Sequence, residues 1–194
     1  MKIVITGGIG CGKSYVSELI IREYLPTFSL YDYDSIVKQL YEDKTIQSAL
    51  YLNFGTSDRS EISRHVFRNK KGMSDLKRIF SEPLSTTMIK ANLLPDVVLD
   101  IPIWYEYRRD IPIQPDFVVT VACDYHTQVA RVKSRDNRTD AEIQRIIDSQ
   151  ATNIKSSDFV VNTNTGVDLH GQLTDILSAM KITTDKQRSS PQIL

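Results

Sequence analysis

Five short apolar segments divide the chain at intervals that suit buried strands. They are rich in Val, Ile and Phe, do not alternate with polar residues, and occupy positions 3–6, 28–31, 97–101, 117–122 and 159–162. Continuous apolar runs of this length are typical of parallel strands that are covered on both faces. The pattern therefore predicts a five-stranded parallel sheet.

Helical spacing characterises the stretches that lie between these segments. Thr139 and Glu142 have the Ser/Thr-x-x-Glu spacing of a capping box at the start of one such helix. Strands that alternate with helices predict an α/β fold with right-handed crossovers. The helical stripes, mainly apolar, are Val16, Leu19, Ile20 and Tyr24; Ile143, Ile146, Ile147 and Gln150; and Leu169, Leu173, Ile176, Leu177 and Met180.

One long stretch interrupts the alternation of strand and helix. Residues 35–95 have helical character and contain no convincing strand. A crossover between parallel strands needs far fewer residues, so this stretch predicts a helical insertion. We expect a core formed by residues 1–34 and 96–182, with the insertion at 35–95. The polar residues 183–194 are expected to form a flexible tail.

Composition and charge narrow the class of protein. The 194 residues contain 24 Lys and Arg against 24 Asp and Glu, so the formal net charge is zero. Nucleic-acid binding needs an excess of positive charge, and this class is therefore excluded. No segment approaches the roughly 20 apolar residues of a spanning helix, and no signal peptide is visible. We expect a cytoplasmic protein that binds neither nucleic acid nor membrane and acts as a monomer.

A glycine-rich loop carries the strongest functional signal. Residues 7–14 read Gly-Gly-Ile-Gly-Cys-Gly-Lys-Ser and match G-x-x-x-x-G-K-[ST] between a strand and a helix. Glycines let consecutive N–H groups point inward and form an anion nest at a helix N-terminus. Lys13 supplies positive charge to the β- and γ-phosphates, and the Ser14 hydroxyl can ligate Mg²⁺. An ordinary glycine-rich turn is the alternative, but spacing and context favour nucleotide phosphate binding. The candidate ATP-binding residues are Gly8, Gly10, Cys11, Gly12, Lys13, Ser14 and the adjoining Tyr15.

The two cysteines of the chain suit a reducing compartment. Cys11 and Cys123 lie far apart in sequence and cannot form a disulfide framework or a four-ligand zinc site. Cys11 occupies a variable position of the phosphate loop, where a small side chain is tolerated. A redox-active thiol of low pKa at a helix N-terminus is the alternative.

Acidic residues follow the second and third predicted strands. Asp32 and Asp34 follow the second strand, and Asp100 lies at the end of the third. In open α/β sheets, ligands bind in the crevice at the carboxyl ends of the strands. Asp34 is therefore a candidate base for an acceptor hydroxyl, although the N-cap of a helix beginning near Ser35 is an equal alternative. Asp100 fits the Walker B position and can hold Mg²⁺ through its water shell.

A basic cluster follows the fourth predicted strand and contains Arg131, Lys133, Arg135 and Arg138. On a helix, positions 131, 135 and 138 share one face. Their guanidinium groups could close over the transferring phosphoryl group as a lid, which we place at about residues 126–156. A solvated helix face is the alternative interpretation.

Together these motifs resemble the dephospho-CoA kinase family. The resemblance runs in order from residue 1 to about residue 166, and its most specific parts are the phosphate loop and Asp100-Ile101-Pro102-Ile103-Trp104-Tyr105-Glu106. Asp32-Tyr33-Asp34 and the pair Arg131 and Arg135-Asp136 also match. Lesser landmarks are Arg64-His65-Val66-Phe67 and Glu82-Pro83-Leu84.

The resemblance implies a three-layer P-loop kinase core of α/β class, with a five-stranded parallel sheet, a helical acceptor-binding insertion and an arginine lid. It implies transfer of the γ-phosphate of ATP, with Mg²⁺, to the ribose 3′-hydroxyl of dephospho-CoA. Asp34 would be the base and Asp32 its neighbour. The roles implied for other residues are lid arginines for Arg131 and Arg135, the adenine-side loop for 162–166 with Asn164, and acceptor binding for Lys38, Arg64 and Glu106.

Three departures from the family pattern lie on the acceptor or lid side. Where the family usually has His-Pro, this chain has Glu82-Pro83. Where the family usually has Arg, this chain has Lys38, so a bidentate phosphate clamp is replaced by a point charge. Residues 150–158 form a shorter segment than usual and lack an arginine often found there. A deoxynucleoside monophosphate kinase of viral type therefore stays open, as does an ATP-binding regulator without turnover. A GTPase is disfavoured because no Asn-Lys-x-Asp motif is present.

Overall fold

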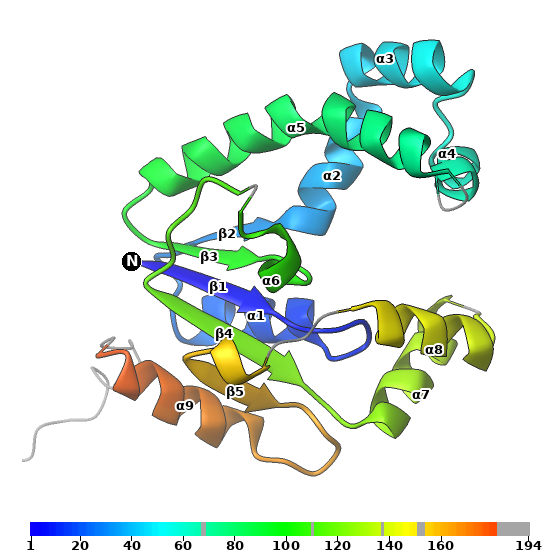
Figure 1. Cartoon of the computed structure of the whole chain (residues 1–194). Helices are drawn as coiled ribbons and strands as arrows, with labels where there is room; N and C mark the ends of the chain where they lie inside the picture. The colour runs from blue at the N-terminus through cyan, green and yellow to red at the C-terminus, as the bar shows by residue number, and fades with distance from the viewer. Residues whose placement is uncertain (67–68, 110, 137, 151–153, 182–194) are drawn as a thin grey trace, which may run out of the picture.

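The computed structural model describes residues 1–66, 69–109, 111–136, 138–150 and 154–181. Within them, five strands form one parallel sheet in the order β2-β3-β1-β4-β5 (Figure 1). The predicted five-stranded parallel sheet is confirmed, and each boundary agrees to within one residue. The strands are β1 (Lys2–Thr6), β2 (Ser29–Asp32), β3 (Val97–Asp100), β4 (Phe117–Ala122) and β5 (Phe159–Asn162).

Helices cover both faces of this sheet. On one face pack α1 (Lys13–Glu23) and α9 (Leu169–Ala179), whose Leu19 and Leu173 lie in one buried cluster with Ile3 of β1. On the other face, Met88 and Trp104 pack with Val4 and Leu99. They belong to α5 (Lys70–Leu93) and α6 (Trp104–Tyr107). The apolar sequence runs of β1, β3 and β4 are explained by this burial from two sides.

In the described residues, the chain between β2 and β3 forms four helices joined by short non-helical connections. Its helices are α2 (Tyr33–Glu42), α3 (Lys44–Phe54), α4 (Arg59–Val66) and α5. They enclose a separate apolar cluster that contains Leu50, Ile62 and Phe80. Helix α5 extends from these helices to the sheet (Figure 1). It therefore contributes to two clusters: Phe80 packs among these helices, and Met88 packs on the sheet.

Two helices project from the carboxyl end of the sheet after β4, namely α7 (Tyr125–Asp136) and α8 (Asp140–Ser149) (Figure 1). Helix α8 begins with the predicted capping box, in which Glu142 Oε2 accepts from the Thr139 N–H at 2.9 Å. The prediction that Arg138 shares a helix face with Arg131 and Arg135 is wrong. Helix α7 ends at Asp136, because the extended N-cap Thr139 starts a new helix immediately after Arg138.

The carboxyl ends of three neighbouring strands, β2, β3 and β1, lie at the same edge of the sheet. Asp100 is in register with Ile5 of β1 and with Asp32 of β2. β1 lies between β3 and β4, so the loop after β1 emerges where the strand order changes direction. A short helical turn, η1 (Ile154–Ser156), precedes β5.

No helix in the described ranges is both long and apolar enough to cross a membrane. The expected tail at 183–194 lies outside the described residues.

Candidate active site

The loop of residues 7–14 joins β1 to α1, and its glycines are required by close packing. Gly10 has φ +74°, and a Cβ there would approach the Gln128 carbonyl oxygen and Val132 Cγ2 to 2.9 Å each. A Cβ on Gly7 would collide with the carbonyl oxygen of Val121. The loop is therefore pressed against β4 and α7, and side chains are excluded from both contacts.

The N-terminus of α1 is prepared for an anion. Its N-cap, Gly12, has φ +85° and provides no side-chain hydrogen bond. The Val16 N–H is the first in this helix to bond back, to the Gly12 carbonyl at 3.0 Å. The amides of Lys13, Ser14 and Tyr15 consequently lack intrahelical acceptors, as at any helix start. Together with the helix dipole and the Lys13 ammonium, they form a site for negative charge.

Asp100 is buried beside this loop without a hydrogen-bond partner for either carboxylate oxygen. Its exposed fraction is 2%. Burial raises its pKa from 3.8 to about 6. The Lys13 ammonium and the nearby Ser14 hydroxyl oppose this shift, and the negative charges of Asp32 and Asp34 add to it. An unsatisfied buried carboxylate next to a phosphate loop has the chemistry of a cation ligand.

Asp32, not Asp34, caps α2. Asp32 Oδ1 accepts from the N–H of Asp34 at 3.0 Å and from that of Ser35 at 3.4 Å, and Oδ2 accepts from the Ser35 hydroxyl at 2.7 Å. The alternative in which Asp34 serves as the N-cap is therefore wrong. Asp34 lies in the first turn of α2 with an exposed side chain. Because Asp32 already satisfies the helix start, the Asp34 carboxylate is available for another task.

A cavity of about 390 Å³ lies beside the phosphate loop. Four residues predicted to bind ATP or the transferring phosphate line it, and the remaining walls are mainly apolar. Arg131 is held at its edge, with Nη2 donating to the Thr163 carbonyl at 2.6 Å and Nη1 to Thr163 Oγ1 at 3.0 Å. The size and lining suit a nucleobase with its ribose. The lining residues are Gly12, Tyr15, Arg131, Thr163, Asn164, Val167 and Leu169.

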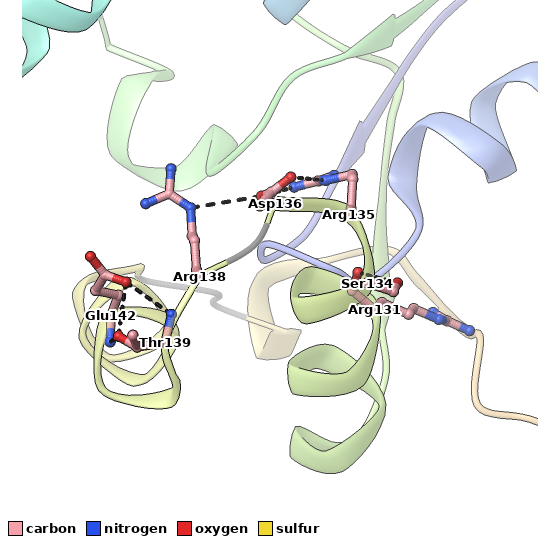
Figure 2. A network of polar contacts seen from close by, with 7 residues as sticks. All are labelled: Arg131, Ser134, Arg135, Asp136, Arg138, Thr139 and Glu142. Atoms are coloured by element: carbon pink, nitrogen blue, oxygen red, sulfur yellow. Dashed lines mark hydrogen bonds and ion pairs between the residues drawn. The ribbon is translucent and has the colours of Figure 1, made fainter.

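The three arginines of the basic cluster do not act as one face. Figure 2 shows their guanidinium groups pointing in different directions. Asp136 accepts from Arg135 Nε at 2.6 Å and Nη2 at 2.8 Å, and Arg138 Nε lies 3.8 Å from the same carboxylate. The Asp136 carboxylate raises the pKa of Arg135, and the negative charge of Asp34 adds to this effect. Arg135 and Asp34 are thus within electrostatic reach of each other.

The three residues expected on the acceptor side lie on different helices. Lys38 is exposed on α2, one turn after Asp34. Arg64 is exposed on α4, and its Nε donates to the Ser60 carbonyl of the same helix at 3.4 Å. Glu106 is exposed on α6, directly after the turn that follows β3. The structure thus places Lys38 next to Asp34, whereas Arg64 bonds within its own helix.

The two cysteines, distant in sequence, are neighbours in space. Cys11 is buried, and Gln128 Nε2 donates to its Sγ at 3.3 Å. Burial, followed by the neighbouring Cys11 thiol, raises the pKa of Cys123 to about 12. Cys123 is therefore a neutral thiol at physiological pH.

Two further residues of the site, Gln128 and Gln150, were not singled out as functional, and the bond made by Thr163 within the expected adenine-side loop was not predicted. Gln128 and Gln150 bond the backbone of Ile9, and the Thr163 hydroxyl donates to the Cys11 carbonyl at 2.7 Å. All three contacts join segments far apart in sequence, so no local pattern could signal them. The available hints concern Thr163, which lies in the expected adenine-side loop and directly follows a strand at the ligand-binding edge of the sheet.

Comparison with known proteins agrees with this geometry. Residues 1–168 match the family model of dephospho-CoA kinase. A dephospho-CoA kinase from Fusobacterium nucleatum is 30% identical over 87% of this chain and 92% of its own. A crystal structure from Thermus thermophilus superimposes with a TM-score of 0.79 at 22% identity, covering 94% of this chain and 98% of that one. Shikimate kinase from Acinetobacter baumannii gives 0.59 at 14% identity, with 93% of each chain covered, which supports the P-loop kinase fold.

The match extends over the phosphate loop, both acidic strand ends, the helices between β2 and β3, and the α7–α8 pair. It therefore includes every element that the geometry brings to the carboxyl edge of the sheet. The chain belongs to the dephospho-CoA kinase family, a family of phosphate-transferring enzymes.

Proposed function

We propose that this protein transfers the γ-phosphate of ATP to the ribose 3′-hydroxyl of dephospho-CoA. Family membership supports the reaction class. The observation that carries the proposal is the position of Asp34. Since Asp32 caps α2, the exposed Asp34 carboxylate is left within electrostatic reach of both Asp100, beside the phosphate loop, and Arg135 of α7. That is where an acceptor hydroxyl must lose its proton.

The ATP side of the mechanism follows from the loop and its adjoining cavity. The cavity bounded by Tyr15 and Asn164 accepts the nucleoside, and the open amides at the start of α1 bind the phosphates. Lys13 adds a positive charge on a flexible side chain, which contacts the β- and γ-phosphates. Arg131, fixed by Thr163, closes the cavity next to the loop. These groups hold the triphosphate so that its terminal phosphorus faces the acceptor.

A Mg²⁺ ion fits this site. Mg²⁺ keeps several waters and takes few protein oxygens, and Asp100 has two oxygens without partners while Ser14 offers a hydroxyl nearby. No cluster of three or more His, Cys, Asp or Glu side chains suited to a metal occurs in the described part of the chain. Ser14 and Asp100 would therefore hold the ion together with the nucleotide. When bound, it neutralises negative charge on the phosphates.

On the acceptor side, Asp34 accepts the proton of the 3′-hydroxyl. The hydroxyl oxygen attacks the γ-phosphorus of ATP in line, and ADP leaves. Arg135 lies within reach to neutralise charge on the transferring group, while Asp136 orients its guanidinium. We assign acceptor binding to the helices within 35–95, with Lys38, Arg64 and Glu106 as candidate contacts. The helices within 35–95 have an apolar cluster of their own, which supports a unit that can move relative to the core of residues 1–34 and 96–182. The lid remains assigned to about residues 126–156.

The decisive experiment measures ADP production from ATP and Mg²⁺ with dephospho-CoA and, separately, with each deoxynucleoside monophosphate. We expect turnover only with dephospho-CoA, and mass spectrometry of the product should place the new phosphate on the 3′-oxygen. Turnover only with monophosphates would replace this proposal with the nucleotide kinase alternative. ATP binding without ADP formation would indicate a regulator.

The role of Asp34 is tested by Asp34→Asn, with Glu42→Gln at the far end of the same helix as a matched control. We expect kcat to fall about 10²–10⁴-fold in Asp34→Asn because the hydroxyl loses its base, while the Kd for ATP stays unchanged. Glu42→Gln should leave both constants unchanged. Since Asp32 is the cap, the melting temperatures should agree with the wild type. A kcat within threefold of the wild type would remove the assignment.

Three expectations stay predictions: a monomeric state, a cytoplasmic location, and a tolerated rather than redox-active Cys11. The first is checked by the molar mass in solution and the third by activity after treatment with hydrogen peroxide.

A further inference from the structure

The two peptide groups that flank Ile9, at the tip of the phosphate loop, are each held by a glutamine. Its N–H donates to Gln150 Oε1 at 2.7 Å. Its carbonyl accepts from Gln128 Nε2 at 2.8 Å. Gln128 belongs to α7, and Gln150 is the C-cap of α8. Two consecutive peptides of the loop are thus fixed, each by one side chain from one of the two projecting helices.

The hydrogen bond to Gln150 comes from a different helix than the bonds that Gln128 and Arg131 make to the loop. Gln128 and Arg131 lie on α7, where Val132 also packs against Gly10. Gln150 reaches the loop from the end of α8, and its own N–H is bonded to the Ile147 carbonyl. The position of α8 and the orientation of the Ile9 N–H are therefore linked directly by one hydrogen bond.

A carboxamide is the appropriate chemistry at this point. The N–H groups of a phosphate loop attract anions, and a carboxylate there would compete with and repel the triphosphate. The neutral Gln150 oxygen satisfies the Ile9 N–H without adding negative charge. The amides of Lys13, Ser14 and Tyr15 stay open, so the β-phosphate site does not depend on Gln150.

We propose that Gln150 is a positioning residue for phosphoryl transfer, which fixes the Gly8–Ile9 peptide through the Ile9 N–H and thereby couples the placement of the α7–α8 pair to the γ-phosphate. This inference rests on the proposed kinase function. It predicts that loss of the Gln150 acceptor affects the reaction of the terminal phosphate more than nucleotide affinity. Misplacement of a reacting group by about 1 Å can lower a rate about 100-fold.

The test compares Gln150→Met, which keeps the side-chain length but removes the acceptor, with Gln144→Met. Gln144 lies on the same helix, and its Nε2 donates to Asp148 Oδ1 of that helix at 2.6 Å. We expect Gln150→Met to lower kcat at least tenfold, with the Kd for ADP and the melting temperature close to those of the wild type. Gln144→Met should match the wild type in all three.

Two outcomes overturn the proposal. One is an unchanged kcat in Gln150→Met. The other is a parallel loss of ADP affinity, kcat and melting temperature, which would indicate a structural role alone.

Amide hydrogen exchange at Ile9 tests the geometry without any acceptor substrate. The Ile9 N–H should be protected in the wild type and in Gln144→Met, and should exchange faster in Gln150→Met. Gln150→Glu retains an acceptor oxygen, so it should keep this protection while raising the KM for ATP through charge repulsion. Equal Ile9 exchange in all variants contradicts the inference. Failure of the wild type to phosphorylate dephospho-CoA contradicts the proposed function instead, so the two failures are distinguishable.

Discussion

Asp100 is buried without a hydrogen-bond partner, and a proton or a bound cation can relieve this unfavourable state. Its exposed fraction of 2% removes solvation from both oxygens. Residues with this property are retained where ligand binding requires them, because the same charge that lowers stability attracts the ligand. At the scale of the single residue, the charged Asp100 carboxylate therefore lowers the stability of the fold and raises the affinity for a ligand.

This trade predicts the effect of Asp100→Asn. The folded pKa of about 6 lies above the ordinary value of 3.8, so the stabilising contribution of protonated Asp100 is present below pH 3.8 and is lost as the pH rises through 6. At pH 7 the variant should be more stable than the ligand-free wild type by about 2–3 kcal/mol. Urea unfolding from pH 4 to 8 checks this, and the gap should close towards pH 4.

The same substitution should abolish the stabilisation that Mg²⁺ and ATP give to the wild type, because the cation loses its carboxylate. A variant that is less stable at pH 7, or a gap that widens on acidification, would contradict the assigned environment of Asp100.

At the scale of the element, the phosphate loop and α7 form a joint unit. Gly10 fits against the Gln128 carbonyl and Val132, and Gln128 and Arg131 bond to the carbonyls of Ile9 and Gly10. The loop therefore takes its shape from α7 as much as from its own glycines. This explains why the motif alone indicates phosphate binding but not the orientation of its tip.

Gly10→Ala tests this packing, and Gly55→Ala is a matched control. Both glycines have φ near +74°, but a Cβ on Gly55 meets no atom within 4 Å. Gly55→Ala should lower the free energy of unfolding by about 1–2 kcal/mol, from backbone strain alone. Gly10→Ala adds a collision with α7 and should cost more, with loss of ADP binding measured by calorimetry. Equal losses in the two variants would show that α7 does not press on the loop.

At the scale of the whole molecule, α5 connects two apolar clusters. Phe80 lies in the cluster of the helices before it, and Met88 lies on the sheet. A rigid helix that enters both clusters can transmit the position of the acceptor-binding helices to the core. The two ends of one helix should therefore respond differently to loss of a side chain.

Phe80→Ala and Met88→Ala test this division of the molecule. Each removes a large buried side chain and should lower the free energy of unfolding by about 2–5 kcal/mol. Phe80→Ala should raise the KM for dephospho-CoA and leave the Kd for ADP unchanged. Met88→Ala should lower the melting temperature of the whole molecule and affect both substrates. Identical kinetic effects would mean that the clusters are not functionally separate.

Much of this architecture could be predicted from local patterns. The apolar runs located all five strands, and the Thr139–Glu142 spacing located the start of α8. The distribution of roles among neighbouring acids could not be predicted, because Asp32 and Asp34 are equally good N-caps by composition. The one-helix interpretation of Arg138 failed because helical spacing does not reveal where a helix ends.

The amino-acid sequence by itself determined the strands, the phosphate loop and the family of this protein, since these depend on short-range periodicity and on residue spacing within a few positions. Only the tertiary structure decided that Asp32 caps α2, that Arg131 binds Thr163 and that Gln150 bonds Ile9. The Arg131 and Gln150 contacts join distant segments and form only after the sheet has brought its carboxyl edge together, whereas the Asp32 cap is local. The physical reason is that local propensity acts along the chain, whereas active-site chemistry depends on distances through space.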